Sequence, residues 1–269
     1  MAKPTPRTVT VINKHVLSPN MLRIVLGGEA LADFPEGQEG GYIKLILPEE
    51  GQSISDLPQT ALIELLAKKS VRVRSYTVRA FDAKACQLTL DFALHSNSYA
   101  TLGPACEWAK HCTVGDNIII NGPGAVKLVD NAADWFFLAG DMTALPAISV
   151  NLEQLPEDAK GYAVIEVIDE ADKQNIKAPE GVDIHWVINP HPDQANTLLA
   201  DKVKSLAWPE GKPNVWVASE FESMRALRRY FKQERQVARG DIYVSSYWKM
   251  GDTDEGNKAA KKIDPEATL

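Results

Sequence analysis

Apolar and polar positions alternate along the first half of the chain, in short runs separated by glycine and proline turns. Between Thr8 and Val16, for instance, Val9 and Val11 alternate with polar neighbours. A period of two residues predicts strands with one buried face. We expect six of them, over residues 8–16, 21–26, 42–47, 73–78, 87–94 and 117–120. Short strands at this spacing favour a six-stranded antiparallel β-barrel, or a sandwich.

Two helical patterns interrupt these strands. Leu62, Leu65 and Leu66 have helical spacing and predict a helix over residues 59–69. A second, shorter helix is expected over residues 103–111, directly before the last strand of this half.

The second half has a different rhythm, because strands now alternate with helices. Trp135 to Ala139 is a continuous apolar run, as expected for a strand buried on both faces. Further strands are expected at 162–168, 184–188, 214–218 and 242–245, with helices over 144–155, 197–208 and 222–235. This alternation predicts an α/β domain with a parallel sheet and right-handed crossovers.

The two patterns predict two domains and a tail. We expect a β-barrel over residues 1–128, an α/β domain over 129–250, and a polar tail over 251–269 with a short helix. The charge changes at the same place: residues 1–128 hold 13 basic and 12 acidic side chains, and residues 129–269 hold 16 and 24. A barrel followed by a nucleotide-binding type of sheet is the layout of flavin reductases, although this is an analogy of fold alone.

Composition and charge exclude several classes of protein. The net charge of −7 argues against nucleic-acid binding, because such proteins need a basic face. The apolar runs are too short for a membrane span, and the first residues resemble no secretion signal, so we expect a cytoplasmic protein. Cys86, Cys106 and Cys112 have no metal-type spacing and are odd in number. We therefore expect reduced thiols and no metal site. A monomer is a separate expectation.

The first candidate motif is a strand, Arg74-Ser75-Tyr76-Thr77. A flavin site uses a cation for the FAD phosphates, an aromatic ring against the isoalloxazine and a hydroxyl near N5, and this strand offers all three. An ordinary strand is the other interpretation, since tyrosine and threonine favour strands.

The second motif joins Asp91 and His95, at the end of a strand, to Gly103-Pro104-Ala105 and Trp108. A Gly-Pro turn that enters a helix points backbone N–H groups at what precedes it, which suits a pyrophosphate. The alternatives are a surface histidine and a core tryptophan.

Three further segments follow strands of the predicted parallel sheet, where nucleotides bind. The first contains Gly140, Asp141, Thr143 and Ala144, and its other interpretation is a normal helix cap. The second contains Ser219 and Glu220, with Arg225, Arg228 and Arg229 beyond them as candidates for a phosphate. The third is Tyr247-Trp248, an aromatic pair that suits a flavin face or simply anchors the C-terminus.

In this order and spacing, the segments resemble the siderophore-interacting protein family of ferric-siderophore reductases, within the ferredoxin–NADP reductase-like superfamily. The resemblance runs from about Thr8 to Gly251 and depends on RSYTVR, GPACEWA, LAGDMTALPAI and YWKMG. The chain departs from the pattern at Met142, where an acidic residue is common, and at Cys106, where a small hydroxyl residue is common.

The resemblance implies FAD held between barrel and sheet, with NAD(P)H or ferredoxin as electron donor. It assigns the barrel motifs to FAD and the residues after the strands of the sheet to the pyridine nucleotide. It also implies that Lys44, Lys127 and Lys249 hold an anionic ferric siderophore. No residue acts as a catalyst by itself, because FAD carries the chemistry.

Two alternatives remain open. One is a ferredoxin or flavodoxin reductase of the same superfamily that does not act on siderophores. The other is a non-catalytic protein that binds ferric siderophores without FAD.

Overall fold

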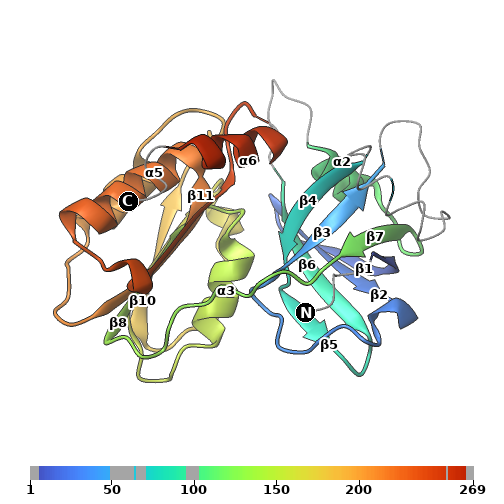
Figure 1. Cartoon of the computed structure of the whole chain (residues 1–269), viewed down its shortest axis with the longest axis horizontal. Helices are drawn as coiled ribbons and strands as arrows, with labels where there is room; N and C mark the ends of the chain where they lie inside the picture. The colour runs from blue at the N-terminus through green and yellow to red at the C-terminus, as the bar shows by residue number, and fades with distance from the viewer. Residues whose placement is uncertain (1–5, 49–63, 65–70, 95–102, 253, 265–269) are drawn as a thin grey trace. The chain divides into compact units, whose positions relative to one another are not determined.

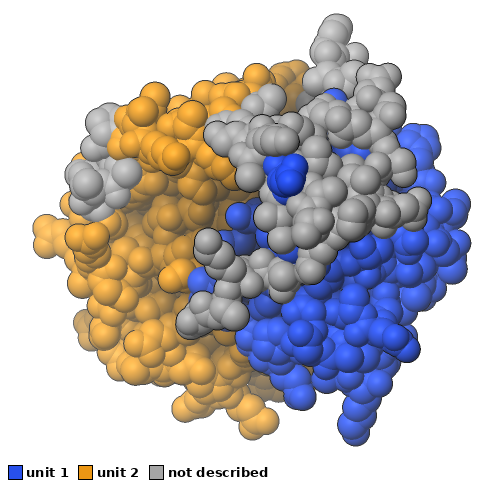
Figure 2. Space-filling model, turned by 45° about the vertical axis from the view of Figure 1, so that its right-hand side comes forward, with its two compact units in different colours: residues 1–126 blue, residues 127–269 orange. Residues whose placement is uncertain are grey.

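The computed structural model describes residues 6–48, 64, 71–94, 103–252 and 254–264. The chain divides into two compact units, residues 1–126 and 127–269, which are coloured separately in Figure 2. The first unit holds the predicted barrel and the second holds the predicted α/β domain. The expected helix over residues 59–69 lies outside the described residues, apart from Glu64.

The first unit is a curled antiparallel sheet of seven described strands (Figure 1). Their order is β4-β3-β7-β1-β2-β6-β5. Their bounds are β1 (Arg7–Ser18), β2 (Met21–Gly27), β3 (Tyr42–Leu47), β4 (Arg72–Thr77), β5 (Ala80–Asp82), β6 (Gln87–Ala93) and β7 (Asn117–Asn121). The prediction of six strands was therefore one too few. It missed β5, because three residues are too short to show an alternating pattern.

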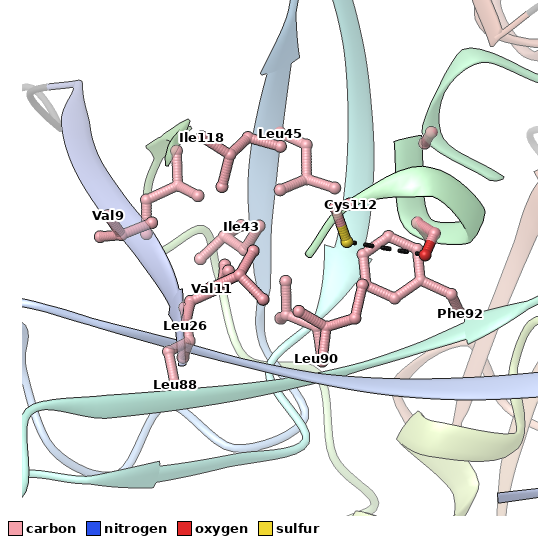
Figure 3. Close-up of a cluster of buried hydrophobic side chains, with 14 of the residues drawn as sticks. Val9, Val11, Leu26, Ile43, Leu45, Leu88, Leu90, Phe92, Cys112 and Ile118 are labelled. Carbon is pink, nitrogen blue, oxygen red and sulfur yellow. Dashed lines mark hydrogen bonds between the residues drawn. The ribbon is translucent and has the colours of Figure 1, made fainter. Parts of the chain in front are cut away.

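The core of this unit comes from the inward positions of the alternating strands. Val9 and Val11 of β1 are at most 1% exposed, as the pattern predicted. Figure 3 shows them among side chains from β2, β3, β6 and β7. Cys112 lies at the edge of this core, where its Sγ donates to the carbonyl of Ala109 at 3.6 Å. Burial raises the pKa of the Cys112 thiol, so this cysteine is an apolar packing residue.

The second unit is a parallel sheet of five strands in the order β10-β9-β8-β11-β12. The strands are β8 (Trp135–Gly140), β9 (Lys160–Val167), β10 (Gly181–Ile188), β11 (Pro213–Glu220) and β12 (Ile242–Trp248). All six residues of β8 are buried, which confirms a central strand covered on both faces. Trp135, Phe137 and Ala139 pack with side chains of α4 (Leu198–Ser205) and α5 (Phe221–Arg229).

The other helices of this unit are α3 and α6. Helix α3 (Leu145–Glu153) follows β8, and its residues 145–152 are all buried. Helix α5 is shorter than the predicted 222–235, because a π-helical turn, Tyr230–Glu234, replaces its expected end. Helix α6 (Asp254–Ile263) belongs to the second unit and contacts β12 (Figure 1).

No helix among the described residues has the length and apolarity that a membrane crossing requires. Within the same residues, no group of three or more His, Cys, Asp or Glu side chains is arranged to hold a metal ion.

Candidate functional site

Strand β4 presents the Arg74–Thr77 motif on two faces. Cross-strand pairing places Arg74 opposite Leu45 and Tyr76 opposite Ile43, two residues of the buried core. Arg74 and Tyr76 therefore share one face. Ser75 and Thr77 occupy the other face, where Ser75 pairs with exposed Lys44 of β3. The motif thus offers a cation and a ring on one side, and two hydroxyls on the other.

The ring of Tyr76 belongs to a cluster of three aromatic side chains. Its centroid lies 4.2 Å from that of Phe92 in β6, and Phe92 lies 5.8 Å from Trp108 in α2 (Pro104–His111). Trp108 is half-buried and packs against the barrel core, which agrees with the structural interpretation of this residue. The cluster fixes α2 against the strand that carries Arg74.

The N-terminus of α2 has no side-chain cap among the described residues. Gly103 is its N-cap residue and Pro104 is its first residue. A Cβ added to Gly103 would meet no atom of the described chain within 4 Å. The start of a helix of eight residues suits a phosphate group, which the backbone N–H groups and the helix dipole favour.

Asp91 has a structural role in the described barrel. Its side chain is 3% exposed and forms a bidentate ion pair with Arg23, at 2.6 and 2.7 Å. Arg79, two residues beyond Thr77, lies 3.9 Å from the same carboxylate. Asp91 thus holds a second arginine near the flavin motif, and a direct contact of Asp91 with a cofactor stays a prediction. His95 lies outside the described residues.

The loop between β8 and α3 begins at a close backbone contact. A Cβ on Gly140 would lie 2.5 Å from the carbonyl oxygen of Ala218 and 2.8 Å from the Cβ of Ala144. Only glycine fits there without moving β11 or α3. Asp141 and Thr143 follow, and the Asp141 carboxylate accepts from the Thr143 amide at 2.9 Å and from its hydroxyl at 2.6 Å.

Asp141 also links this loop to the ends of two other strands. Its second oxygen accepts from the backbone N–H of Glu220 at 2.7 Å and from the indole N–H of Trp248 at 2.8 Å. Glu220 in turn caps α5, accepting from the amides of Glu222 and Ser223, while Ser219 beside it is fully buried. The structure therefore brings together Asp141, Thr143, Glu220 and Trp248, four residues that were predicted from three separate motifs.

Glu166, near the end of β9, belongs to none of the predicted motifs. Burial raises its pKa to about 7, the hydrogen bond from Asn189 opposes that rise, and the negative charges of Asp141 and Glu220 add to it. The amide of Asn189 donates to it at 2.9 Å. A carboxylate inside a buried strand was the available sequence signal. Glu166, Asp141 and Glu220 thus form an acidic group at the carboxyl edge of the sheet.

The predicted cationic side chains are the lysines proposed for the siderophore and the arginines proposed for a phosphate. Lys44 and Lys127 are exposed, whereas Lys249 is half-buried and pairs with Asp252 at 3.1 Å. Arg228 forms a buried ion pair with Asp264 at 2.5 Å, and Arg225 lies 3.5 Å from the same carboxylate. These two arginines therefore tie α5 to the end of the chain. Because α5 runs back from the carboxyl edge, Arg228 is also far along the helix from where nucleotides bind.

A curled antiparallel sheet followed by a five-stranded parallel sheet defines the fold of the ferredoxin–NADP reductase-like flavoenzymes. A ferredoxin–NADP+ reductase from Plasmodium falciparum has this fold, with a TM-score of 0.62 at 12% identity, over 90% of this chain and 96% of that chain. The sequence matches the family model described as "Siderophore-interacting FAD-binding domain" over residues 10–127. It matches the model described as "Siderophore-interacting protein" over residues 133–251. The chain belongs to the siderophore-interacting protein family.

Two relatives are similar over almost their whole length. The ferric vibriobactin reductase ViuB of Vibrio cholerae is 37% identical over 93% of this chain and 92% of its own. The siderophore-interacting protein SipS from Aeromonas hydrophila has a TM-score of 0.82 at 32% identity, covering 96% of this chain and 97% of its own. The residues of the first unit fit FAD, because the backbone N–H groups at the N-terminus of α2 and the Arg74–Tyr76 face supply the donors and the ring that this cofactor needs.

Proposed function

We propose that this protein is an FAD-dependent ferric-siderophore reductase that takes electrons from NAD(P)H. The main support is the similarity to ViuB, which covers 93% of this chain and therefore spans both units. When bound, FAD accepts one hydride, with its two electrons, and passes these electrons on singly. Two ferric complexes then take one electron each.

The first unit binds FAD in this proposal. The N–H groups at the start of α2 and the Arg74 guanidinium hold the pyrophosphate, and the ring of Tyr76 packs beside the isoalloxazine. The Phe92 contact, at a centroid distance of 4.2 Å, orients that ring before the cofactor arrives. The hydroxyls of Ser75 and Thr77 lie on the opposite face of β4 from the Tyr76 ring. A contact between one of these hydroxyls and flavin N5 therefore requires N5 to lie at the edge of the strand, and not over the face that carries Tyr76.

The second unit binds the electron donor in this proposal. Nucleotides bind at the carboxyl edge of parallel sheets, where Gly140, Asp141 and Glu220 lie. Gly140 lets the backbone come close, and Thr143 and Ala144 form the turn into α3. Ferredoxin is the alternative donor. A monomer in the cytoplasm remains our prediction for the assembly and its location.

The lysines supply positive charge for the ferric siderophore. Lys44 of the first unit and Lys127 and Lys249 of the second are the candidates to attract a small anionic complex, and the net charge of −7 is screened beyond about 10 Å. Oxygen donors bind Fe(III) strongly and Fe(II) less tightly, so one-electron reduction loosens the metal. The protein itself needs no iron ligand, because the siderophore carries the iron.

The test is a visible spectrum followed by anaerobic turnover. The purified protein should be yellow or should bind added FAD, and NADH or NADPH should bleach it. Adding a ferric siderophore should restore the flavin spectrum while a ferrous chelator such as ferrozine reports Fe(II). A protein that binds no FAD overturns the proposal in favour of a non-catalytic siderophore carrier. Rapid electron exchange with ferredoxin or flavodoxin, without Fe(II) release, overturns it in favour of a ferredoxin or flavodoxin reductase.

A further inference from the structure

The carboxylate of Asp141 accepts hydrogen bonds from residues at the ends of three strands, β8, β11 and β12. The residue is 6% exposed, and its two oxygens accept four hydrogen bonds. One oxygen serves Thr143, directly after β8. The other accepts from Glu220 at the end of β11 and from Trp248 at the end of β12. One side chain therefore sets the relative positions of segments that are 79 and 107 residues away in sequence.

Glu220 completes the connection to the C-terminal segment. Its Oε2 accepts from the amides of Glu222 and Ser223, and its Oε1 accepts from the amide of Met250 at 3.1 Å. The residues on both sides of Lys249 are thus tied to carboxylates, Trp248 through its indole and Met250 through its backbone. Lys249 itself extends over the ring of Phe221, with its Nζ 5.9 Å from the centroid.

We infer that Asp141 is a positioning residue, which fixes Trp248 and thereby the lysine that follows it. This inference rests on the proposed function, in which Lys249 contacts the ferric siderophore. Asp141 touches no reacting atom in this role. It holds the 248–250 segment in one conformation before substrate arrives, so that no binding energy is lost in ordering it.

The chemistry requires a carboxylate at this position. Four donors converge on two oxygens, and aspartate is acceptor-only on both. Asparagine has the same shape but one oxygen and one NH2 group. Whichever way its amide turns, it presents donors either to Thr143 or to the N–H groups of Glu220 and Trp248. Asp141→Asn therefore tests the hydrogen bonds without emptying the site.

Steady-state kinetics of the FAD-loaded enzyme test the role. For Asp141→Asn at saturating NAD(P)H, we expect KM for a ferric siderophore to rise about tenfold, with FAD content changed little, because the hydrogen bond to the Trp248 indole loses its charged acceptor. Asp134→Asn is the matched control. Asp134 precedes the same strand at its opposite end and accepts from the Lys212 amide at 2.7 Å. It should leave KM unchanged.

A double-mutant cycle with Trp248→Phe separates positioning from general loosening. If Asp141 acts through the indole N–H, the two substitutions together should raise KM clearly less than the product of their separate effects. Independent effects that multiply in full would overturn the inference, as would a wild-type KM in Asp141→Asn.

Proton NMR of the wild-type protein gives a readout without turnover. Using ¹⁵N-labelled tryptophan, the indole signal that disappears in Trp248→Phe should exchange slowly with water, and it should shift and exchange faster in Asp141→Asn. Fast exchange in the wild type would overturn the inference even if a variant failed to fold. Absence of siderophore reduction by the wild type would instead overturn the proposed function, while the NMR result would still test the contact.

Discussion

The ring of Tyr76 packs against that of Phe92, with the two centroids 4.2 Å apart and the planes tilted by 34°. This contact joins β4, which carries the flavin motif, to β6, and Trp108 extends it to α2. Three elements that supply the proposed FAD contacts therefore share one aromatic cluster. Its packing determines where the Tyr76 ring lies.

Substituting Phe92 should therefore weaken FAD binding. Phe92 is fully buried, and Phe92→Leu removes the aromatic contact and leaves a void, at a cost of about 1–3 kcal/mol in the free energy of unfolding. We expect the dissociation constant for FAD to rise about tenfold, because the Tyr76 ring then adopts several orientations. Fluorescence titration of the apoprotein with FAD measures this constant.

Phe136→Leu is the control for this experiment. Phe136 is 2% exposed in β8 of the second unit, so the same substitution should cost similar stability. It should leave the FAD constant unchanged. Equal losses of FAD affinity in the two variants would show that general destabilisation, and not the aromatic cluster, controls binding.

A second prediction concerns the pH dependence of stability. Burial raises the pKa of Glu166 to about 7 from 4.5, so the folded protein holds a proton there that the unfolded chain releases. Stability therefore falls as pH rises from about 4.5 to about 7, and the loss levels off above that range. Glu166→Gln keeps the acceptor for Asn189 and removes the titration. It should stabilise the protein by about 3 kcal/mol at pH 8 and by nothing near pH 4.

Thermal unfolding of both proteins between pH 4 and pH 9 measures the difference, and ¹³C NMR of the carboxyl group gives its midpoint directly. Glu157→Gln, a change in the turn before β9, should show no such pH dependence. A Glu166 midpoint near 4.5 would contradict the prediction.

The elements followed from local pattern, whereas the site depended on long-range contacts. Alternation at Val9 and Val11 and the apolar run at Trp135 correctly gave the two sheets, because burial of one or both faces dictates those patterns. Asp141 was recognised only as a helix cap or nucleotide contact. Its bonds to Glu220 and Trp248 join distant segments, and no local pattern encodes such pairs.

The same limit explains Asp91 and the arginines of α5. Asp91 was assigned to FAD by its place in a motif, yet its carboxylate pairs with Arg23 across the β2–β6 ladder. Arg225 and Arg228 were candidates for binding a phosphate, and both form ion pairs with Asp264. Which partner each charged group pairs with depends on the fold, so residue type and spacing could name these groups but could not predict these ion pairs.

A third prediction tests the siderophore lysines. Lys127→Ala combined with Lys249→Ala should raise KM for a ferric siderophore at least tenfold, because two positive charges near the anionic complex are lost. The flavin content should not change. The effect should shrink as ionic strength rises, since salt screens these charges. Lys84→Ala, in the exposed turn between β5 and β6, is the control and should leave KM unaltered. Wild-type reduction by the double variant at limiting substrate would refute the assigned role.

The fourth prediction is a preference for NADH over NADPH. The ribose of a bound nucleotide lies beyond the second strand of such sheets, here β9. The described residues that follow β9 include Asp169 and Glu170, which are exposed, and Lys173 is ion-paired with Glu170. A 2′-phosphate adds nearly two negative charges and would meet these carboxylates.

Steady-state kcat/KM for the two donors, and competition by 5′-AMP against 2′,5′-ADP, measure this preference. We expect NADH to be favoured at least tenfold, and 5′-AMP to compete more strongly than 2′,5′-ADP. Glu170→Lys reverses one charge after β9 and removes the ion pair of Lys173, so it should lower the ratio of kcat/KM for NADH to kcat/KM for NADPH. Glu180→Lys makes the same change in charge just before β10, at the amino ends of the strands, and should leave this ratio unchanged. If both variants narrowed the ratio equally, the net charge of the domain would control the choice of donor, and the acids after β9 would have no special part in it.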